Sequence, residues 1–257
     1  MHRARKRFGQ HFLHDQNVIE SILRAINPQP DENLLEIGPG QGALTYPLLQ
    51  RCGKLIAIEL DRDLVPVLAG QAPNFGELEI ISADILEFEL SSIPGNRTFR
   101  VVGNLPYNIS TPLMFHLLES VRQIQDMHFM VQKEVALRIV ANPGEPNYGR
   151  LSVMLQYQCD CQYLLDVPPG CFRPPPRVDS AVIRLTPFSS PQYDVGDYDR
   201  FAGIVQAAFS QRRKTISNSL KTVVDRKTIL ACEIDPGARA ENLAVADFAR
   251  LSRASDL

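Results

Sequence analysis

Short apolar runs alternate with helical patterns from residue 33 to residue 132. A strand buried on both faces reads as a short continuous apolar run, whereas an amphipathic helix repeats its apolar positions every three or four residues. Segments such as 43–51 and 63–71 lie between the runs and have helical spacing. This alternation predicts an α/β fold, with a parallel sheet covered by helices on both faces. The predicted strands are 34–37, 55–59, 78–81, 100–103 and 128–131.

The pattern extends on both sides of this region. Residues 15–25 predict a helix, because Val18, Ile19, Ile22 and Leu23 fall on one side of it. Residues 133–141 and 151–159 predict two further helices, separated by a loop rich in Pro, Gly and Asn. Residues 164–167 and 180–185 predict two antiparallel strands at the end of the sheet. The three prolines at 174–176 cannot lie inside a sheet.

The pattern changes after Pro187. Residues 189–191, Ser-Ser-Pro, predict a linker, and the segments beyond it have helical periodicity and no convincing strand. One predicted face holds Phe201, Ile204, Val205, Ala208 and Phe209. We therefore expect two domains, a sheet domain at 1–188 and a small helical domain at 189–257.

Composition narrows the class of protein. The chain has 257 residues, of which 44% are hydrophobic and 22% charged, as in an ordinary globular protein. No apolar run is long enough to span a bilayer, and the basic N-terminus lacks the apolar core of a secretory signal. The five cysteines are scattered, and Cys159-x-Cys161 has the wrong spacing for a zinc knuckle. We expect reduced thiols, no metal and a cytoplasmic protein.

Positive charge is clustered although the net charge is −2. A cluster can bind nucleic-acid phosphates even when the whole molecule is not a polycation. The alternative is that both clusters are simply solvated charge runs. The candidate RNA-binding residues are Arg5, Lys6 and Arg7 near the start, and Arg212, Arg213 and Lys214 near the end.

A loop with the sequence Asn104-Leu105-Pro106-Tyr107 follows the apolar run Val101-Val102-Gly103. The Asn104 amide oxygen can accept a hydrogen bond from an exocyclic amino group. Pro106 stiffens the loop, and Tyr107 offers a ring face on which a base can stack. The alternative is an ordinary proline-containing turn with a packed tyrosine. The chemistry of the loop suits a planar amine held for methylation.

A glycine loop follows the first predicted strand, with Gly38, Gly40 and Gly42 in alternate positions. Such a loop allows a ligand to approach the backbone closely, and Glu59 at the end of the second strand can bind a ribose. NAD would satisfy both features, but the spacing is not the dinucleotide fingerprint. Asp84 after the third strand can accept a hydrogen bond from an adenine amino group. Together with the Asn104 loop, these strand ends predict an S-adenosylmethionine pocket.

These motifs together resemble the ribosomal RNA adenine dimethylase family. The chain is similar in particular to bacterial members acting on small-subunit (16S) ribosomal RNA, whose loss gives kasugamycin resistance. The resemblance covers nearly the whole chain, and it implies a Rossmann-like class I methyltransferase sheet followed by a helical domain. The strings that carry it are 5–13 (RKRFGQHFL), the glycine loop, 104–110 (NLPYNIS), 132–134 (QKE), 148–152 (YGRLS), 172–178 (FRPPPRV) and 209–215 (FSQRRKT).

The resemblance also implies roles for individual residues. His11 and Leu13 would close over the cofactor, with Gly38, Glu59, Asp84 and Asn104 lining it. The family usually has Asn where this chain has His11, and a main-chain contact or a side-chain donor would tolerate this change. A role that needs an amide oxygen would not. Otherwise His11 would be a surface residue.

The activity that the resemblance implies is methylation of two adjacent adenosines in the 3′-terminal hairpin of small-subunit ribosomal RNA. Each adenosine would receive two methyl groups at N6, late in small-subunit biogenesis. We expect Asn104 and the Leu105 carbonyl to accept the two N–H bonds of N6. The target base must leave its stack, and Tyr107 and Phe172 could sandwich it, although an aromatic in a proline-rich loop is often buried. We expect a monomer.

Three alternatives remain open from the sequence. The first is another N6-adenine or amide-nitrogen methyltransferase, against which segment 5–13 and the helical C-terminal part argue. The second is a non-catalytic ribosome assembly factor, against which the presence of Glu59, Asp84 and Asn104 argues. The third is an NAD oxidoreductase, for which the chain offers no catalytic Tyr-Lys or His-Asp arrangement.

Overall fold

The computed structural model describes residues 10–95, 98–211 and 213–255. These residues form two compact units. The first contains residues up to 136 together with 162–187, and the second contains 137–161 together with the residues from 188 onward. The second unit thus takes in residues that precede the expected boundary at 188. That residues 189–257 form a domain of their own stays a prediction.

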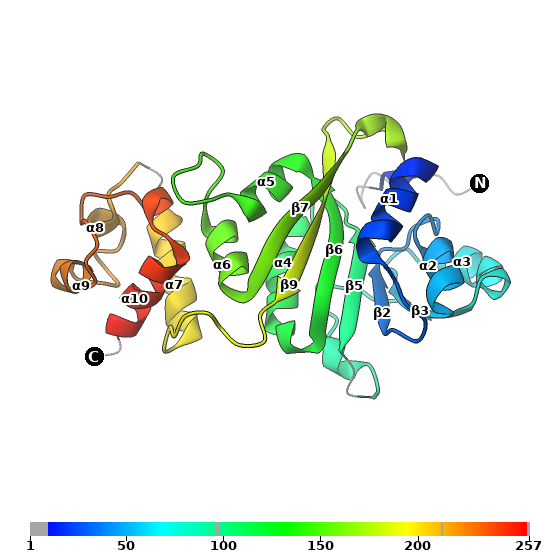
Figure 1. The fold of residues 1–257 in the computed structure, drawn as a ribbon, viewed down its shortest axis with the longest axis horizontal. Coiled ribbons are helices and arrows are strands. Elements are labelled where there is room, and N and C mark those ends of the chain that lie inside the picture. Colours follow the sequence, from blue (N-terminus) through cyan, green and yellow to red (C-terminus); the bar gives the residue numbers. More distant parts are fainter. Residues whose placement is uncertain (1–9, 96–97, 212, 256–257) are drawn as a thin grey trace. The chain divides into compact units, whose positions relative to one another are not determined.

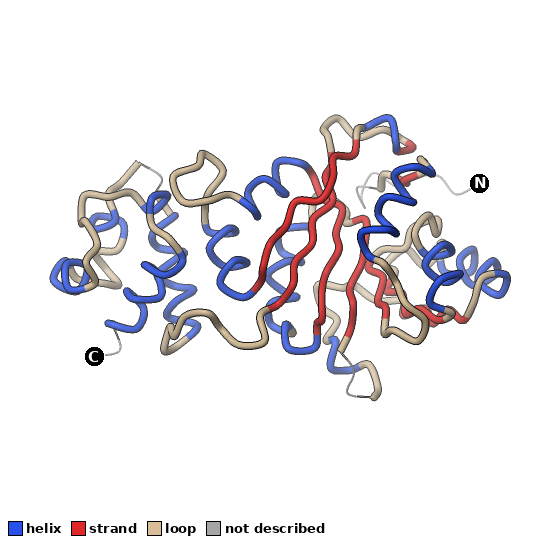
Figure 2. Tube along the Cα trace, viewed as in Figure 1, coloured by secondary structure: helices blue, strands red, loops and turns tan. Residues whose placement is uncertain are grey.

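A seven-stranded sheet forms the centre of the first unit, in the order β4-β3-β2-β5-β6-β9-β7. Strands β2 to β6 pair in parallel, and β9 pairs antiparallel with β6. This confirms the predicted mixed sheet with antiparallel pairing near one end (Figures 1 and 2). The strands are β2 (Leu34–Ile37), β3 (Lys54–Ile58), β4 (Glu77–Ile81), β5 (Phe99–Asn104), β6 (Ile124–Gln132), β7 (Cys159–Val167) and β9 (Ser180–Pro187).

The order of the strands creates a crevice at the carboxyl ends of the central strands β2 and β5. The chain runs outward from β2 through β3 to β4, and then returns to place β5 on the other side of β2. Ligands of open α/β sheets bind beyond the carboxyl ends of the strands at such a reversal. Gly103 allows the close approach of β5 to β2, because a Cβ there would lie 2.6 Å from the Ile37 carbonyl oxygen.

Helices lie on both faces of this sheet, and in Figure 1 α1 is in front of it and α4 behind it. The side chain of Asp15 caps α1 by accepting from the Val18 N–H at 3.0 Å, and Asn27 ends the helix in the left-handed conformation. Ile19, Ile22 and Leu23 of α1 are buried in the core cluster. The helices of this unit are α1 (Gln16–Ile26), α2 (Thr45–Cys52), α3 (Val65–Gln71), α4 (Ser110–Glu119) and the start of α5 (Lys133–Val140).

A second, two-stranded sheet was absent from the sequence-based prediction. Strand β1 (Phe12–Leu13) pairs antiparallel with β8 (Phe172–Arg173), so that Phe12 faces Arg173 and Leu13 faces Phe172. The strands are too short to show a period of two, and their partners are about 160 positions apart in sequence. This ladder fixes the N-terminal segment beside the proline-rich loop.

The second unit is helical. Tyr157 packs against Phe201 with ring centroids 4.6 Å apart, and the predicted face of Phe201, Ile204, Val205 and Ala208 is buried. Its helices are the rest of α5, α6 (Arg150–Gln158), α7 (Tyr198–Phe209), α8 (Ile216–Ser219), α9 (Arg226–Ala231) and α10 (Val245–Ala254). Short 3₁₀ turns complete the chain at 72–74, 90–92, 121–123, 169–171 and 240–242.

Candidate functional site

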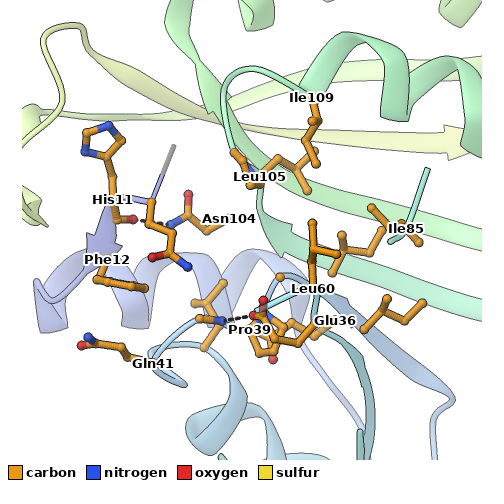
Figure 3. A pocket seen from close by; sticks show the side chains of 18 of the residues that line it. His11, Phe12, Glu36, Pro39, Gln41, Leu60, Ile85, Asn104, Leu105 and Ile109 are labelled. Atoms are coloured by element: carbon orange, nitrogen blue, oxygen red, sulfur yellow. Dashed lines mark hydrogen bonds between the residues drawn. The ribbon is translucent and has the colours of Figure 1, made fainter. Parts of the chain in front are cut away.

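A cavity of about 280 Å³ lies at the carboxyl ends of β2, β3, β4 and β5 in the first unit (Figure 3). Its volume is near the lower end of the roughly 300–1,000 Å³ typical of small-molecule sites. Of the predicted cofactor residues, His11, Leu13, Gly38, Glu59, Asp84 and Asn104 all line this cavity. Residues from distant parts of the sequence therefore meet where the strand order predicts a ligand.

The glycine loop forms one wall. Gly38, Gly40 and Gly42 all have positive φ, at 66°, 59° and 85°, which is the left-handed region that favours glycine. The Gly40 N–H donates to Glu59 Oε2 at 3.1 Å, so the loop and the end of β3 hold each other. A Cβ on Gly40 would contact the Phe12 ring at 3.3 Å. The loop is thus packed between Glu59 and the N-terminal segment.

Glu59 is held by backbone donors on both carboxylate oxygens. Oε2 accepts from Gly40, and Oε1 accepts from the Asp61 N–H at 2.7 Å. The side chain is 6% exposed, and burial raises its pKa, although these hydrogen bonds oppose the rise. Each oxygen keeps a second lone pair, so the carboxylate can still accept from two ligand hydroxyls.

Glu36 is a residue that the sequence analysis did not single out. It is the second-last residue of β2 and lines the cavity, it is 2% exposed, and its Oε2 has no hydrogen-bond partner among the described residues. Burial raises its pKa to about 8, and the charge of Glu59 adds to the rise. A buried carboxyl group with an open oxygen can receive a cationic or hydrogen-bonding part of a ligand.

Asp84 follows β4 and also faces the cavity. Its Oδ1 accepts from the Leu86 N–H at 3.0 Å, which fixes the side chain at the start of the following turn. Ala83 and Ile85 line the cavity on either side of it. This end of the cavity therefore combines one carboxylate with apolar surface, as an adenine ring requires.

Asn104 is the last residue of β5 and has a defined amide orientation. Its Nδ2 donates to the His11 carbonyl oxygen at 3.0 Å (Figure 3). Its Oδ1 receives no hydrogen bond from a described residue. The Leu105 carbonyl also lacks a donor in the described part, whereas the Pro106 carbonyl accepts from Ile109 N–H and the Tyr107 carbonyl from Ser110 Oγ. Two acceptors without a donor from the described residues thus follow one another in the chain at the end of β5, the second of them on the buried residue Leu105.

Tyr107 lines the cavity, and neighbouring residues contact both its hydroxyl and one face of its ring. Its hydroxyl lies 2.6 Å from Ser180 Oγ, and burial raises its pKa, so the phenol stays neutral. The His11 imidazole stacks on the ring with centroids 5.4 Å apart and planes at 25°. The His11 Nδ1 also lies 2.8 Å from the Pro174 carbonyl oxygen.

Phe172 was predicted as a second stacking face, and the structure does not support this. The side chain is 2% exposed and belongs to the core cluster, because the pairing of Leu13 with Phe172 covers it. It is not among the residues that line the cavity. In this conformation the Phe172 ring cannot receive a base.

The predicted phosphate-binding residues are only partly described. Arg213 and Lys214 are exposed in the turn between α7 and α8. Arg5, Lys6, Arg7 and Arg212 lie outside the described residues. An RNA contact by either cluster stays a prediction.

The site also includes residues that the sequence analysis did not indicate. Gln10 Nε2 donates to Asp61 Oδ2 at 3.2 Å and so connects the N-terminal segment to the residues after β3. The apolar lining includes Phe12, Leu60, Ile85 and Ile109. Their only signal in the sequence is their place next to a predicted motif.

Across the described ranges, no cluster of three His, Cys, Asp or Glu side chains could hold a metal ion. No helix in the part of the chain that the structure describes is long and apolar enough to cross a membrane.

Comparisons with known proteins agree with this chemistry. The family model described as "Ribosomal RNA adenine dimethylase" matches residues 1–256. A relative from Saccharophagus degradans, named "Ribosomal RNA small subunit methyltransferase A", is 50% identical over 98% of this chain and 94% of its own length. Relatives of the same name from Pseudomonas savastanoi and Xanthomonas campestris are each 51% identical, over 98% and 97% of this chain and 94% and 95% of their own.

Solved structures are similar over almost the whole chain as well. A dimethyladenosine transferase from Plasmodium falciparum has a TM-score of 0.80 and 26% identity, covering 94% of this chain and 96% of that one. The 23S rRNA methyltransferase ErmE has a TM-score of 0.76 and 27% identity, covering 96% of this chain and 100% of that one.

Proposed function

The chain belongs to the ribosomal RNA adenine dimethylase family, and from this premise we propose its reaction and its substrate. It is an enzyme that uses S-adenosylmethionine to convert two adjacent adenosines of small-subunit (16S) ribosomal RNA to N6,N6-dimethyladenosine. The two targets lie in the 3′-terminal hairpin, and the enzyme acts late in small-subunit biogenesis. It works as a monomer in the cytoplasm.

The residues around the cavity fit S-adenosylmethionine. Glu59 would accept the ribose hydroxyls, Asp84 would accept the adenine amino group, and Ile85 would pack against the adenine ring. Glu36, with a buried and unpartnered oxygen, would hold the positively charged end of the amino-acid part. When bound, S-adenosylmethionine supplies a methyl group activated by a sulfonium.

The observation that carries the proposal is the pair of open acceptors at Asn104 Oδ1 and Leu105 O. The bond from Asn104 Nδ2 to His11 O fixes the amide so that its oxygen is left for the substrate. The next two carbonyls, of Pro106 and Tyr107, are occupied by the turn into α4. An exocyclic amine has two N–H donors, which match two adjacent acceptors.

These acceptors would increase the reactivity of N6. The N6 lone pair is delocalised into the adenine ring, so the free amine is a poor nucleophile. Two acceptors hold its N–H bonds in one orientation, which favours a pyramidal nitrogen with its lone pair directed toward the methyl donor. Fixed dipoles and alignment supply most of the acceleration. No strong base is required, because the N6 proton becomes acidic once the nitrogen is alkylated.

The second methylation uses the same residues with one donor fewer. A monomethylated N6 has a single N–H, so one acceptor position must admit a methyl group. Leu105 and Ile109 give the cavity apolar surface beside the acceptors. The cavity would therefore also accept the monomethylated adenine, and the reaction would continue to the dimethylated product.

The RNA would be positioned by charge outside the cavity. Arg5, Lys6 and Arg7, and Arg212, Arg213 and Lys214, would contact phosphates without reading sequence. The partner would be a late small-subunit assembly intermediate carrying the unmodified hairpin.

The test is transfer of labelled methyl from S-adenosylmethionine to small subunits from a strain that lacks the modification. We expect N6,N6-dimethyladenosine at two neighbouring positions and no incorporation into fully modified subunits. Asn104→Ala should slow transfer about 100-fold or more, because a preorganised polar contact is lost. Asn17→Ala, an exposed asparagine on α1, is the matched control.

The outcomes separate the alternatives. Cofactor binding without transfer to small subunits would indicate a different nucleic-acid or protein substrate. Absence of cofactor binding by calorimetry would indicate an assembly factor without catalysis. Transfer that persists in Asn104→Ala would contradict the assigned role of the amide.

A further inference from the structure

The His11 side chain covers the ring on which the target base is expected to stack. The imidazole lies nearly parallel to Tyr107, with ring centroids 5.4 Å apart. A hydrogen-bonding contact of 2.8 Å between Nδ1 and the Pro174 carbonyl oxygen holds the imidazole in place. The main chain of His11 has a separate task, since its carbonyl oxygen accepts from Asn104 Nδ2.

The imidazole covers one face of the Tyr107 ring, and a ring face is the surface on which a base can stack. Tyr107 cannot turn away easily, because its hydroxyl is hydrogen-bonded to Ser180, which is fully buried at the start of β9. A base whose N6 reaches Asn104 Oδ1 while it stacks on Tyr107 must pass the residue that contacts both. That residue is His11, which also lines the cavity.

We propose that the His11 imidazole is a placeholder for the target adenine, and that the flipped base displaces it from Tyr107. The inference rests on the proposed function. In the absence of RNA the imidazole keeps the Tyr107 ring covered and in position. When the base enters, it takes over the stacking contact on Tyr107.

Displacement requires only a side-chain rotation. The ring contact with Tyr107 and the contact with Pro174 are both made by the imidazole, so both are lost when the side chain turns away. The pairing of Phe12 with Arg173 and of Leu13 with Phe172 fixes the neighbouring main chain. The His11 carbonyl can therefore keep the Asn104 amide oriented while the imidazole moves. Adenine offers a larger stacking surface than imidazole, which favours the exchange.

An intact placeholder should reduce the apparent affinity for RNA, because only the fraction of molecules with the imidazole displaced can bind the base. We expect His11→Ala and His11→Asn to lower the KM for unmodified small subunits about three- to tenfold, and to change KM more than kcat. His14→Ala, an exposed histidine three positions on, is the control and should leave KM unchanged. Circular dichroism and the midpoint of urea unfolding report whether each variant is folded.

A second measurement tests the contact without RNA. The chain has no tryptophan, so Tyr107→Trp introduces a single tryptophan at the stacking position. An imidazole against this indole quenches its emission, and adding His11→Ala to Tyr107→Trp should raise the fluorescence. Adding His14→Ala should not.

Each outcome decides the proposal. A higher KM in His11→Ala and His11→Asn would mean that the imidazole supports the bound base as a second stacking face, and would overturn the placeholder role. Unchanged KM and unchanged fluorescence would overturn it as well. If the unsubstituted protein transfers no methyl to small subunits, the proposed function fails, which is distinct from failure of the His11 variants.

Discussion

At the scale of single residues, hydrogen-bond partners decide which polar atoms are left for a substrate. Asn104 uses Nδ2 on the His11 carbonyl and keeps Oδ1 open. This contact comes from the main chain of His11, so it does not depend on whether His or Asn occupies position 11. It explains how the chain can carry a histidine where the resembled family usually has asparagine.

Glu36 allows a test of the cavity without any substrate. Its pKa is raised by burial to about 8 in the folded protein, from an ordinary value of 4.5. A raised pKa means that the folded state is favoured while the carboxyl is protonated. The free energy of unfolding therefore falls as pH rises from about 4.5 through about 8, because the buried carboxyl is then driven to ionise. We expect Glu36→Gln to remove this loss, which can reach about 5 kcal/mol. Urea unfolding at pH 5, 7 and 9 without cofactor measures it.

Glu77→Gln serves as the control, since Glu77 is exposed on β4. Its substitution should leave the pH dependence of the unfolding free energy as it is. Equal pH dependence in Glu36→Gln and the unsubstituted protein would show that Glu36 is not a buried, protonated group.

At the scale of elements, the packing of α2 fixes the glycine loop that precedes it. A Cβ on Gly42 would lie 2.3 Å from the Tyr46 ring of α2, and Tyr46 is itself stacked on Phe75 with centroids 4.9 Å apart. The loop can therefore approach α2 only if residue 42 has no side chain. This requirement is separate from the positive φ that the loop glycines share.

Gly42→Ala and Gly53→Ala separate these two effects. Both glycines have positive φ, at 85° and 79°, but a Cβ on Gly53 meets nothing within 4 Å. We expect Gly53→Ala to cost about 1 kcal/mol from backbone strain alone, and Gly42→Ala about 3 kcal/mol, because overpacking adds to it. Urea unfolding measures both, and cofactor affinity should fall only for Gly42→Ala. Equal costs would contradict the steric argument.

Arg100 of β5 connects the sheet to α1 and to the loop that precedes β2. Its guanidinium donates to Asp126 of β6 at 2.9 and 3.0 Å, to the Ile26 carbonyl of α1 at 2.6 Å, and to Glu32 at 2.7 Å. The side chain is only 9% exposed, so these partners depend on it for their charge balance.

Replacing Arg100 should therefore destabilise the fold without touching the cavity. We expect Arg100→Met to lower the free energy of unfolding by about 3–5 kcal/mol, because it leaves the Asp126 and Glu32 carboxylates without their cation. Arg51→Met removes a more exposed ion pair with Glu20 and should cost less than about 1 kcal/mol. Chemical denaturation compares the two. Similar costs would show that the buried network contributes little.

At the scale of the whole molecule, the cavity is proposed to bind the cofactor and one base, so the rest of the RNA needs other surface. The net charge of −2 offers no general attraction for RNA. Affinity must then come from local clusters, of which the structure describes the exposed Arg213 and Lys214.

Salt dependence tests this surface. Each phosphate contact that is lost reduces the slope of log affinity against log salt by about one. We expect the double variant Arg213→Ala with Lys214→Ala to bind small subunits more weakly and with a slope smaller by about one to two. Arg226→Ala with Lys227→Ala, exposed on α9, is the matched control for net charge. A slope that does not change would remove these residues from the RNA surface.

Much of the sheet could be predicted from the sequence because its strands are buried on both faces. Such strands read as continuous apolar runs, and all five predicted parallel strands are present within a few residues of their expected ends. The motif residues at those ends meet in one cavity because parallel strands direct their carboxyl ends to the same edge. Antiparallel strands at 164–167 and 180–185 were also predicted from the chain, but not that the second of them would pair with β6.

The sequence by itself thus determined the fold class and the strand ends at which Glu59, Asp84 and Asn104 meet in one cavity, whereas their roles stay predictions. Only the tertiary structure decided which atoms remain open, that Phe172 is buried under the β1–β8 ladder, and that His11 lies on Tyr107. The physical reason is the separation in sequence between the residues that determine each property. Periodicity and strand-end motifs are local properties of the chain, whereas burial and hydrogen-bond partners depend on segments more than a hundred residues apart, such as the pair His11 and Pro174.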